Sequence, residues 1–409
     1  MLHAARLLDV VNGRIIAPGE VLVEGERISA AGASVPHPAG AQTIDLGDTT
    51  LMPGLIDVHV HLFLHPGAED LQTVEESAPQ RTILATLAAR ADLMAGFTAE
   101  RDMGTEGAGS AGTAVMRAID QGLIPGPRLR ISGNAIDILG GHEDANGFNP
   151  AQQVLSNADY ANDAEQIVAT IRKQYKEGST FVKMYETGED SIASSEQKDK
   201  PAVAGDPEFW SFHTPYQYTQ AQLKTAVDEA ARLGMNVGVH AEGEPGTLYA
   251  AQAGVASIDH ATQLSDETMR LMKEKHIPAV PTFAVLEYHV SSEPAATREH
   301  AMLEYKIREF KRQMAAGISF AVGSDVGPFP HGTQAKEFEL MVRYGMTPLA
   351  VLQADYLNGA QILRWRGQIG ELKTGYYADV IAVPGNPLED ITAVERVAFV
   401  MKGGVVVRK

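Results

Sequence analysis

Two histidines separated by a single residue carry the strongest chemical signal in this sequence. His59 and His61 lie in LIDVHVHL (55–62), whose apolar and β-branched residues predict a strand. Residues i and i+2 of a strand point to the same face, so the two imidazoles project together. Two imidazoles on one face can hold a metal ion, and the sequence therefore predicts a metal site here.

Four more polar residues lie within other strand-like runs or near the carboxyl ends of such runs. They are Lys183 in FVKMY (181–185), His240 in VHAEG (239–243), His260 in SIDHATQ (257–263) and Asp325 in VGSDVG (322–327). Each alone could be a satisfied polar residue of the core. The carboxyl ends of barrel strands surround one point, however, and there these side chains would converge with the histidine pair.

Lys183 needs an account of its own, because a charged ammonium is costly to bury. It could form an ion pair with Asp325. It could instead lose its charge, since burial readily lowers the pKa of a lysine. A neutral amine reacts with carbon dioxide to give a carbamate, a two-oxygen anion able to bridge two cations.

Three other residues are candidates for contacts with a substrate. His142 follows two glycines that would let its loop approach a ligand, where it could stabilise a developing oxyanion or simply lie at the surface. Tyr185 shares a strand face with Lys183 and could hold a carbonyl or carboxylate, or pack in the core. His289 is a weaker candidate. Arg101 is better explained as the partner of a nearby carboxylate than as a substrate contact.

The elements that would position these residues alternate along the middle of the chain. Strands are predicted over 55–62, 97–104, 127–137, 180–186, 236–243, 257–263, 277–284 and 319–327. Amphipathic helices are predicted between them, for example over 81–96, 158–178 and 219–234. This alternation indicates an α/β fold, a (β/α)8 TIM barrel. A doubly wound sheet is the alternative, but no G-x-G-x-x-G follows the first strand.

Both ends of the chain instead contain short strand-like runs. Asn12-Gly13 between apolar alternations indicates a hairpin, and the tail contains ADVIAVPG (378–385) and AVERVAFVMKGGVVVRK (393–409). Neither end has enough strands to bury a face. We therefore predict one β-sandwich domain from 1–52 and 366–409, and a barrel domain over 53–365.

Two predicted connections, 138–157 and 187–217, are too long for simple turns. Both follow strand ends, so they could be lids over a site or plain surface loops. The second contains Trp210, Phe212 and Tyr216, which would suit a bulky apolar substrate.

Composition excludes several classes of function. The sequence has no cysteine, which rules out disulfides, thiolate metal sites and cysteine nucleophiles and leaves nitrogen and oxygen as metal ligands. Its formal charge of −18 argues against nucleic acid or an anionic membrane as the partner. No apolar run approaches the ~18–20 residues of a membrane helix. We expect a cytoplasmic protein, or an exported one whose signal peptide is absent from this sequence.

Over essentially its whole length the chain resembles the amidohydrolase superfamily, in the branch of imidazolonepropionase-like proteins, metal-dependent prolidases and ochratoxin-hydrolysing amidases. Besides the four runs around the polar residues, the resemblance is carried by MPGLIDVHVH (52–61), GFTAERDMG (96–104), GLIPGPRLRISG (122–133) and IGELKTGYYADVIAVPGNPLEDI (369–391). These blocks occur in order and at suitable spacing, so the match is specific.

The resemblance implies a binuclear site, usually zinc. His59 and His61 would hold one metal with Asp325, His240 and His260 would hold the other, and carboxylated Lys183 would bridge them with a hydroxide. Asp325 would act as the catalytic proton shuttle, and His142 as an oxyanion contact. Relatives are commonly homo-oligomers, and an octamer is one expectation.

The expected reaction is hydrolysis of a small-molecule amide, an N-acyl amino acid or a dipeptide. A hydrolase of cyclic amides such as an imidazolone or hydantoin is the alternative. A mononuclear deaminase is expected to lack Lys183, and a non-catalytic scaffold has no need of the ligand set. No cofactor beyond metal is expected.

Overall fold

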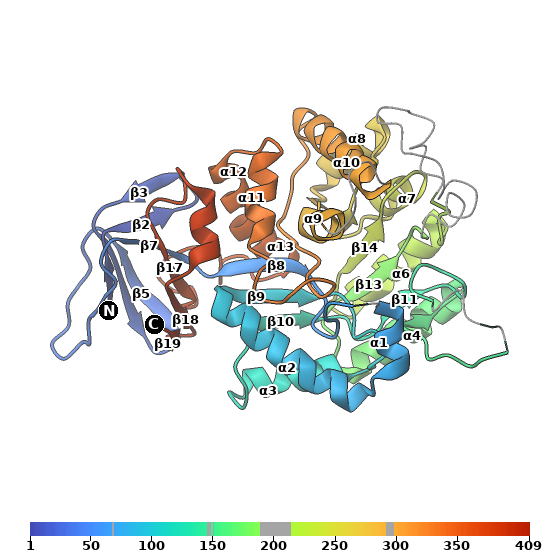
Figure 1. Cartoon of the computed structure of the whole chain (residues 1–409), viewed down its shortest axis with the longest axis horizontal. Coiled ribbons are helices and arrows are strands. Elements are labelled where there is room, and N and C mark those ends of the chain that lie inside the picture. Colours follow the sequence, from blue (N-terminus) through green and yellow to red (C-terminus); the bar gives the residue numbers. More distant parts are fainter. Residues whose placement is uncertain (68, 145–148, 150, 189–213, 292–297) are drawn as a thin grey trace.

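Parallel strands occupy the middle of the molecule and helices lie outside them, while the two ends of the chain meet at one side (Figure 1). This computed structural model describes residues 1–409 except 68, 145–148, 150, 189–213 and 292–297. In the described chain no helix is long and apolar enough to cross a membrane.

The central strands form two parallel sheets with orders β10-β9-β8 and β12-β11-β13-β14-β15-β16. They are β8 (Leu55–Val60), β9 (Phe97–Asp102), β10 (Arg128–Ile131), β11 (Ala135–Asp137), β12 (Ala158–Tyr160), β13 (Val182–Tyr185), β14 (Val237–Ala241), β15 (Ser257–His260) and β16 (Ala279–Val280). Most of their residues are buried on both faces, as expected for parallel strands covered by helices.

Backbone hydrogen bonds link these two sheets on both sides. The amide of Thr180, just before β13, donates to Ile131 of β10 at 2.8 Å. On the other side, Phe320 and Val326 form parallel bridges to Ala279 of β16 and Val60 of β8. The carboxyl ends of all these strands therefore lie at a common edge.

The strand predicted over 319–327 is reduced to these two bridges. Asp325 has a φ of 63°, which lies in the left-handed region and interrupts extended geometry. A Cβ on Gly323 would lie 2.9 Å from that of His59, so the segment also approaches β8 closely. The prediction of a regular strand was wrong here.

The helices are α1 (Glu69–Glu75), α2 (Ala78–Ala95), α3 (Ala111–Asp120), α4 (Ala164–Glu177), α6 (Gln220–Arg232), α7 (Gly246–Ala253), α8 (Asp266–Lys275), α9 (Phe283–Ser291), α10 (Arg298–Ala315), α11 (Lys336–Arg343), α12 (Pro348–Gln353) and α13 (Ala360–Ile362), with a π-helix η1 (Ala354–Gly359) and a 3-10 helix η2 (Ile391–Arg396). The helices predicted over 81–96 and 219–234 correspond to α2 and α6. The helix predicted over 158–178 begins only at Ala164, because Asp163 caps α4 and residues 158–160 form β12. The strand predicted over 277–284 is likewise cut short by the start of α9.

Strands from both ends of the chain share a sheet of order β19-β18-β17-β7-β2-β3, beside a second sheet of order β5-β4-β1-β6 (Figure 1). Their bounds are β1 (Leu2–Ala4), β2 (Arg6–Asp9), β3 (Arg14–Ile16), β4 (Gly19–Glu24), β5 (Arg27–Gly32), β6 (Ile44–Asp45), β7 (Thr49–Pro53), β17 (Val380–Pro384), β18 (Phe399–Lys402) and β19 (Val405–Arg408). The hairpin predicted at Asn12-Gly13 joins β2 to β3. Side chains of both sheets, including Leu2, Val21, Leu51, Val380 and Phe399, form one apolar cluster.

Candidate metal centre and active site

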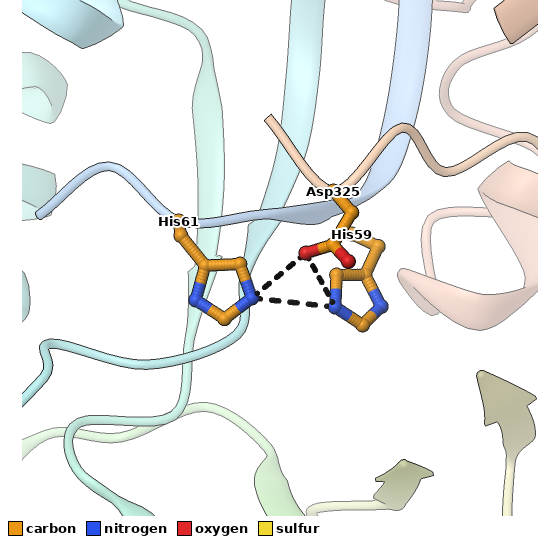
Figure 2. Close-up of side chains that lie close together, drawn as sticks. All are labelled: His59, His61 and Asp325. Atoms are coloured by element: carbon orange, nitrogen blue, oxygen red, sulfur yellow. Dashed lines mark hydrogen bonds and ion pairs between the residues drawn. The ribbon is translucent and has the colours of Figure 1, made fainter. Parts of the chain in front are cut away.

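Three potential metal ligands meet at the carboxyl end of β8 (Figure 2). His59 lies in β8, His61 follows it, and Asp325 comes from the segment that hydrogen-bonds to β8. Oδ1 of Asp325 lies 3.4 Å from Nε2 of His59 and 3.2 Å from Nε2 of His61, and the two Nε2 atoms are 3.3 Å apart. One ligand atom of each residue lies within 4.8 Å of the other two, which is compatible with binding one ion.

The donor chemistry of this group fits a divalent cation. Two imidazole nitrogens 3.3 Å apart repel each other unless a proton or a cation lies between them. Burial lowers the pKa of His59 to about 4, so its ring is neutral at pH 7 and offers a lone pair. Burial opposes protonation of His61 too, but the carboxylates of Asp325 and Glu106 raise its pKa well above 6.5. A bound cation would balance the negative charge of these two carboxylates in place of the proton on His61.

Two further histidines lie beside this group. The ring centroid of His260 is 5.1 Å from that of His59, and its Nδ1 lies 3.9 Å from Oδ2 of Asp325. The ring of His240 is 4.3 Å from that of His260, centroid to centroid. Burial lowers the pKa of both well below 6.5, and Nε2 of His240 has no hydrogen-bond partner among the described residues. Both rings are therefore neutral donors suited to a metal.

Lys183 lies fully buried on β13. Its Nζ has no hydrogen-bond partner and no carboxylate within 4.0 Å in the described chain, and it lies 4.3 Å from the ring centroid of Tyr185. Of the two possibilities left open by the sequence, the direct ion pair with Asp325 is not formed. Burial lowers the pKa of Lys183, although Asp259 and Asp325 oppose the shift. The shift favours the neutral form of the amine, which is the form that carbamate formation requires.

Asp259, which is not among the predicted site residues, contacts His59 on the side of the ring away from Asp325. Its Oδ2 lies 3.5 Å from Nδ1 of His59, and both of its oxygens accept hydrogen bonds from Arg101 at 3.1 Å. Arg101 is thus the partner of a carboxylate, as expected. Burial raises the pKa of Asp259, but Arg101 and His59 outweigh it and lower the value to about 2. Asp259 is therefore an anion that can fix the tautomer and orientation of His59.

A pair of glutamates, also missed, supports His61. Oε1 of Glu106 lies 2.7 Å from Nδ1 of His61, and Glu106 has a φ of 47°. Glu143 hydrogen-bonds to Glu106, and burial together with the charge of Glu106 raises the pKa of Glu143 well above 4.5. Glu143 is therefore the protonated partner, and its bond helps to lower the pKa of Glu106 to about 2 against the effect of burial. The unusual backbone of Glu106 aims its carboxylate at a candidate metal ligand.

His142 and Tyr185 lie together at the other side of the group. Their rings are stacked, with centroids 4.8 Å apart and an interplanar angle of 13°, and His142 is 4.2 Å from the ring of His240. The backbone N–H of His142 donates to Oε1 of Gln217 at 2.6 Å, which fixes the loop. Burial lowers the pKa of His142 to about 4, so its ring is neutral near pH 7.

A cavity of about 310 Å³ opens onto these residues. The predicted site residues on its wall are His59, His61, His142, Tyr185, His240, His260, His289 and Asp325. Its other polar lining includes Glu69, Glu106, Glu143, Glu242, Thr262, Thr282 and Lys306, and its apolar lining is Leu64, Val285, Leu286, Met302 and Pro328. Eight of the nine predicted residues thus line the cavity. The ninth, Lys183, lies behind the wall, with its Nζ against the ring of Tyr185.

Of the three aromatic residues predicted in the second long connection, Tyr216 lies among the residues that the structure describes. Trp210 and Phe212 lie outside the described residues. Tyr216 is 48% exposed and packs edge-on against Tyr249 at a centroid distance of 5.4 Å. Among the described residues it is not part of the cavity wall.

Known proteins match this chain over most of its length. The model of the amidohydrolase family matches residues 50–407. Ochratoxinase of Aspergillus niger is 30% identical over 386 residues, covering 87% of this chain and 75% of that protein. Its crystal structure superposes with a TM-score of 0.82, at 27% identity, covering 100% of this chain and 95% of the other.

Two other proteins are similar over most of their lengths. A Xaa-Pro dipeptidase solved with methionine in its active site has a TM-score of 0.87 and 30% identity, covering 100% of this chain and 99% of the other. Imidazolonepropionase of Shouchella clausii is 25% identical over 415 residues, covering 96% of this chain and 86% of that protein. These similarities, over a fold of the TIM-barrel type, show that the chain belongs to the amidohydrolase family.

Proposed function

We propose that this protein is a binuclear metal-dependent hydrolase that cleaves the amide bond of N-acyl amino acids or dipeptides. The observation that carries the proposal is the meeting of His59, His61 and Asp325 on the wall of a cavity, beside a buried Lys183 whose Nζ has no hydrogen-bond partner among the described residues. Such a set has no evident structural purpose, because buried nitrogen atoms without partners are costly.

We assign His59, His61 and Asp325 to one metal, and His240 and His260 to the other. Lys183, as its carbamate, would bridge the two. The all nitrogen and oxygen donor set suits zinc. When bound, the two ions would lower the pKa of a water and polarise the scissile carbonyl.

The chain itself supplies the proton transfers. Burial raises the pKa of Asp325, but the hydrogen bond and the charge of His61 lower it, so the side chain is an anion that can accept a proton. In the proposed reaction Asp325 accepts a proton from the attacking water and later donates it to the nitrogen of the leaving amine. The carbon–nitrogen bond breaks, and a carboxylic acid and an amine are released.

His142 would stabilise the charge that develops on the carbonyl oxygen. Its neutral ring can donate one N–H, and Nδ1 has no hydrogen-bond partner among the described residues. Tyr185 stacks on His142 and holds the ring in place. His289, on the cavity wall, would contact the substrate farther from the reacting carbonyl.

We infer a (β/α)8 barrel over 53–365 and a β-sandwich from 1–52 and 366–409. The bridges at Phe320 and Val326 support the barrel, and the apolar cluster between the two terminal sheets supports the sandwich. A homo-oligomer of this unit, without nucleic acid or membrane partners, is part of the proposal.

The similarity to an imidazolonepropionase favours a second candidate, hydrolysis of cyclic amides. A screen of the zinc-loaded protein separates the two. We expect hydrolysis of N-acyl amino acids and dipeptides, lost after removal of metal with a chelator and restored by zinc. Turnover confined to imidazolones or hydantoins would favour the second candidate.

A further inference from the structure

Lys306 is a buried cation on the wall of the cavity. It lies in α10, three residues after Leu303 and four before Phe310, both of which are buried. This spacing puts Lys306 on the face of α10 that packs against the rest of the protein, and only 6% of it is exposed. A lysine seldom occupies such a position without a partner.

The described chain offers this ammonium no carboxylate partner. No carboxylate oxygen lies within 4.0 Å of Nζ, and its one hydrogen bond, to Oγ1 of Thr282, is long at 3.5 Å. Both oxygens of nearby Glu337 instead accept backbone N–H groups, of Phe283 at 3.0 Å and Ala284 at 2.7 Å. The charge of Lys306 is therefore only partly compensated by the protein itself.

Thr282 connects Lys306 to the reacting end of the cavity. Its Oγ1 lies 2.8 Å from Nδ1 of His260, and that atom lies 3.9 Å from Oδ2 of Asp325. Lys306 is thus a short distance beyond the candidate metal ligands, on the side formed by β16, α9 and α10. Among the described lining residues it is the one lysine or arginine, whereas four glutamates also line the cavity.

We propose that Lys306 binds the free carboxylate of the substrate and so selects amides whose leaving group is an α-amino acid. This inference rests on the proposed function. In an N-acyl amino acid the carboxylate is two bonds from the amide nitrogen, so a substrate whose carbonyl lies beside Asp325 can place its carboxylate at Lys306 on the same cavity wall. The adjoining Val285, Leu286 and Met302 offer apolar surface to the amino-acid side chain.

The test compares N-acetyl-L-phenylalanine with its neutral analogue N-acetyl-L-phenylalaninamide. Wild type should prefer the acid. Lys306→Met should raise KM for the acid by at least ~30-fold, the loss expected when one member of a buried charge pair is removed. Its kcat/KM for the neutral amide should stay within about threefold, and Lys306→Arg should restore part of the preference. Lys311→Met, an exposed change on the same helix, is the matched control.

A binding measurement separates this inference from the proposed function. Calorimetry with L-phenylalanine and L-phenylalaninamide reports carboxylate binding without turnover. Lys306→Met, or Lys306→Gln if the first variant does not fold, should weaken binding of the amino acid alone, with metal content and melting temperature as in wild type.

The outcomes are distinct. If wild type hydrolyses neither compound nor any related amide, the proposed function fails, and the calorimetric difference still decides the role of Lys306. If a folded, metal-loaded Lys306 variant keeps the preference for the acid and its affinity for L-phenylalanine, Lys306 does not bind the carboxylate.

Discussion

Nδ1 of His59 lies 3.5 Å from Oδ2 of Asp259, whose oxygens are both held by Arg101. This contact leaves Nε2 of His59 directed at His61 and Asp325. A carboxylate behind a ligating histidine fixes its tautomer and raises its basicity. We therefore expect the site to depend on Asp259, a buried residue that is not part of the cavity wall.

Asp259→Asn should weaken zinc binding by about 10–100-fold, the usual effect of losing such a carboxylate. Competition with a chelator measures the affinity. Asp228→Asn, which removes a carboxylate that is 63% exposed on α6, should leave it unchanged. Equal zinc affinity in a folded Asp259→Asn protein would show that the contact with His59 does not support a metal.

Lys183→Ala should lose metal, and activity should fall by at least ~100-fold. Loss of a residue that only orients a metal ligand costs up to about 100-fold, and loss of the ligand itself should cost no less. Short carboxylic acids such as acetate or propionate should restore part of both, since they can occupy the space of the carbamate. Metal content with and without the acid is the measurement. Unchanged turnover in the variant would remove the argument for a carbamate.

Asp325→Asn should reduce kcat by about 10²–10⁴-fold, the range of general acid–base catalysis, while the melting temperature stays near that of wild type. An asparagine keeps the shape of the side chain but cannot accept the proton. Metal analysis of the same sample shows whether the loss reflects proton transfer or loss of the ion. Persistent turnover would assign the proton shuttle elsewhere.

The pH dependence of stability should include a contribution from Glu229, which joins α4 to α6. Hydrogen bonds from Arg232 and Arg172 lower its pKa from 4.5 to about 2. A carboxyl group whose pKa is lowered by folding stabilises the folded protein at pH values above its pKa in the unfolded chain. This contribution is lost as pH falls from about 4.5 toward 2. Glu229→Gln should thus lower the melting temperature at pH 7 and differ less from wild type at pH 3.

Glu304→Gln, an exposed change on α10, serves as the control for this measurement. A gap between wild type and Glu229→Gln that widens on acidification would contradict the sign of the pKa shift.

Residues borne on strands could be predicted from the sequence. The i, i+2 spacing of His59 and His61 places both side chains on one face of their strand. Lys183, His240 and His260 could be placed near them because the carboxyl ends of parallel barrel strands lie together. Asp325 was found by the same rule, although its segment forms only bridges. Its left-handed backbone is a local feature that apolar periodicity does not reveal.

The supporting residues were missed for physical reasons. Asp259 precedes His260, which is the more obvious metal ligand of the pair. The contact of Asp259 with Arg101 joins positions 158 residues apart, and no local pattern predicts it. Glu106 and Glu143 lie in loops, whose conformation no periodicity predicts. Lys306 is detectable in the sequence, because it is a charged residue on the apolar helix face between Leu303 and Phe310.

A site for two metal ions can be tested by metal analysis of the pure protein together with its activity. We expect about two divalent ions per chain at full activity, with activity falling as the second ion is removed. One tightly bound ion per chain with full activity would contradict it.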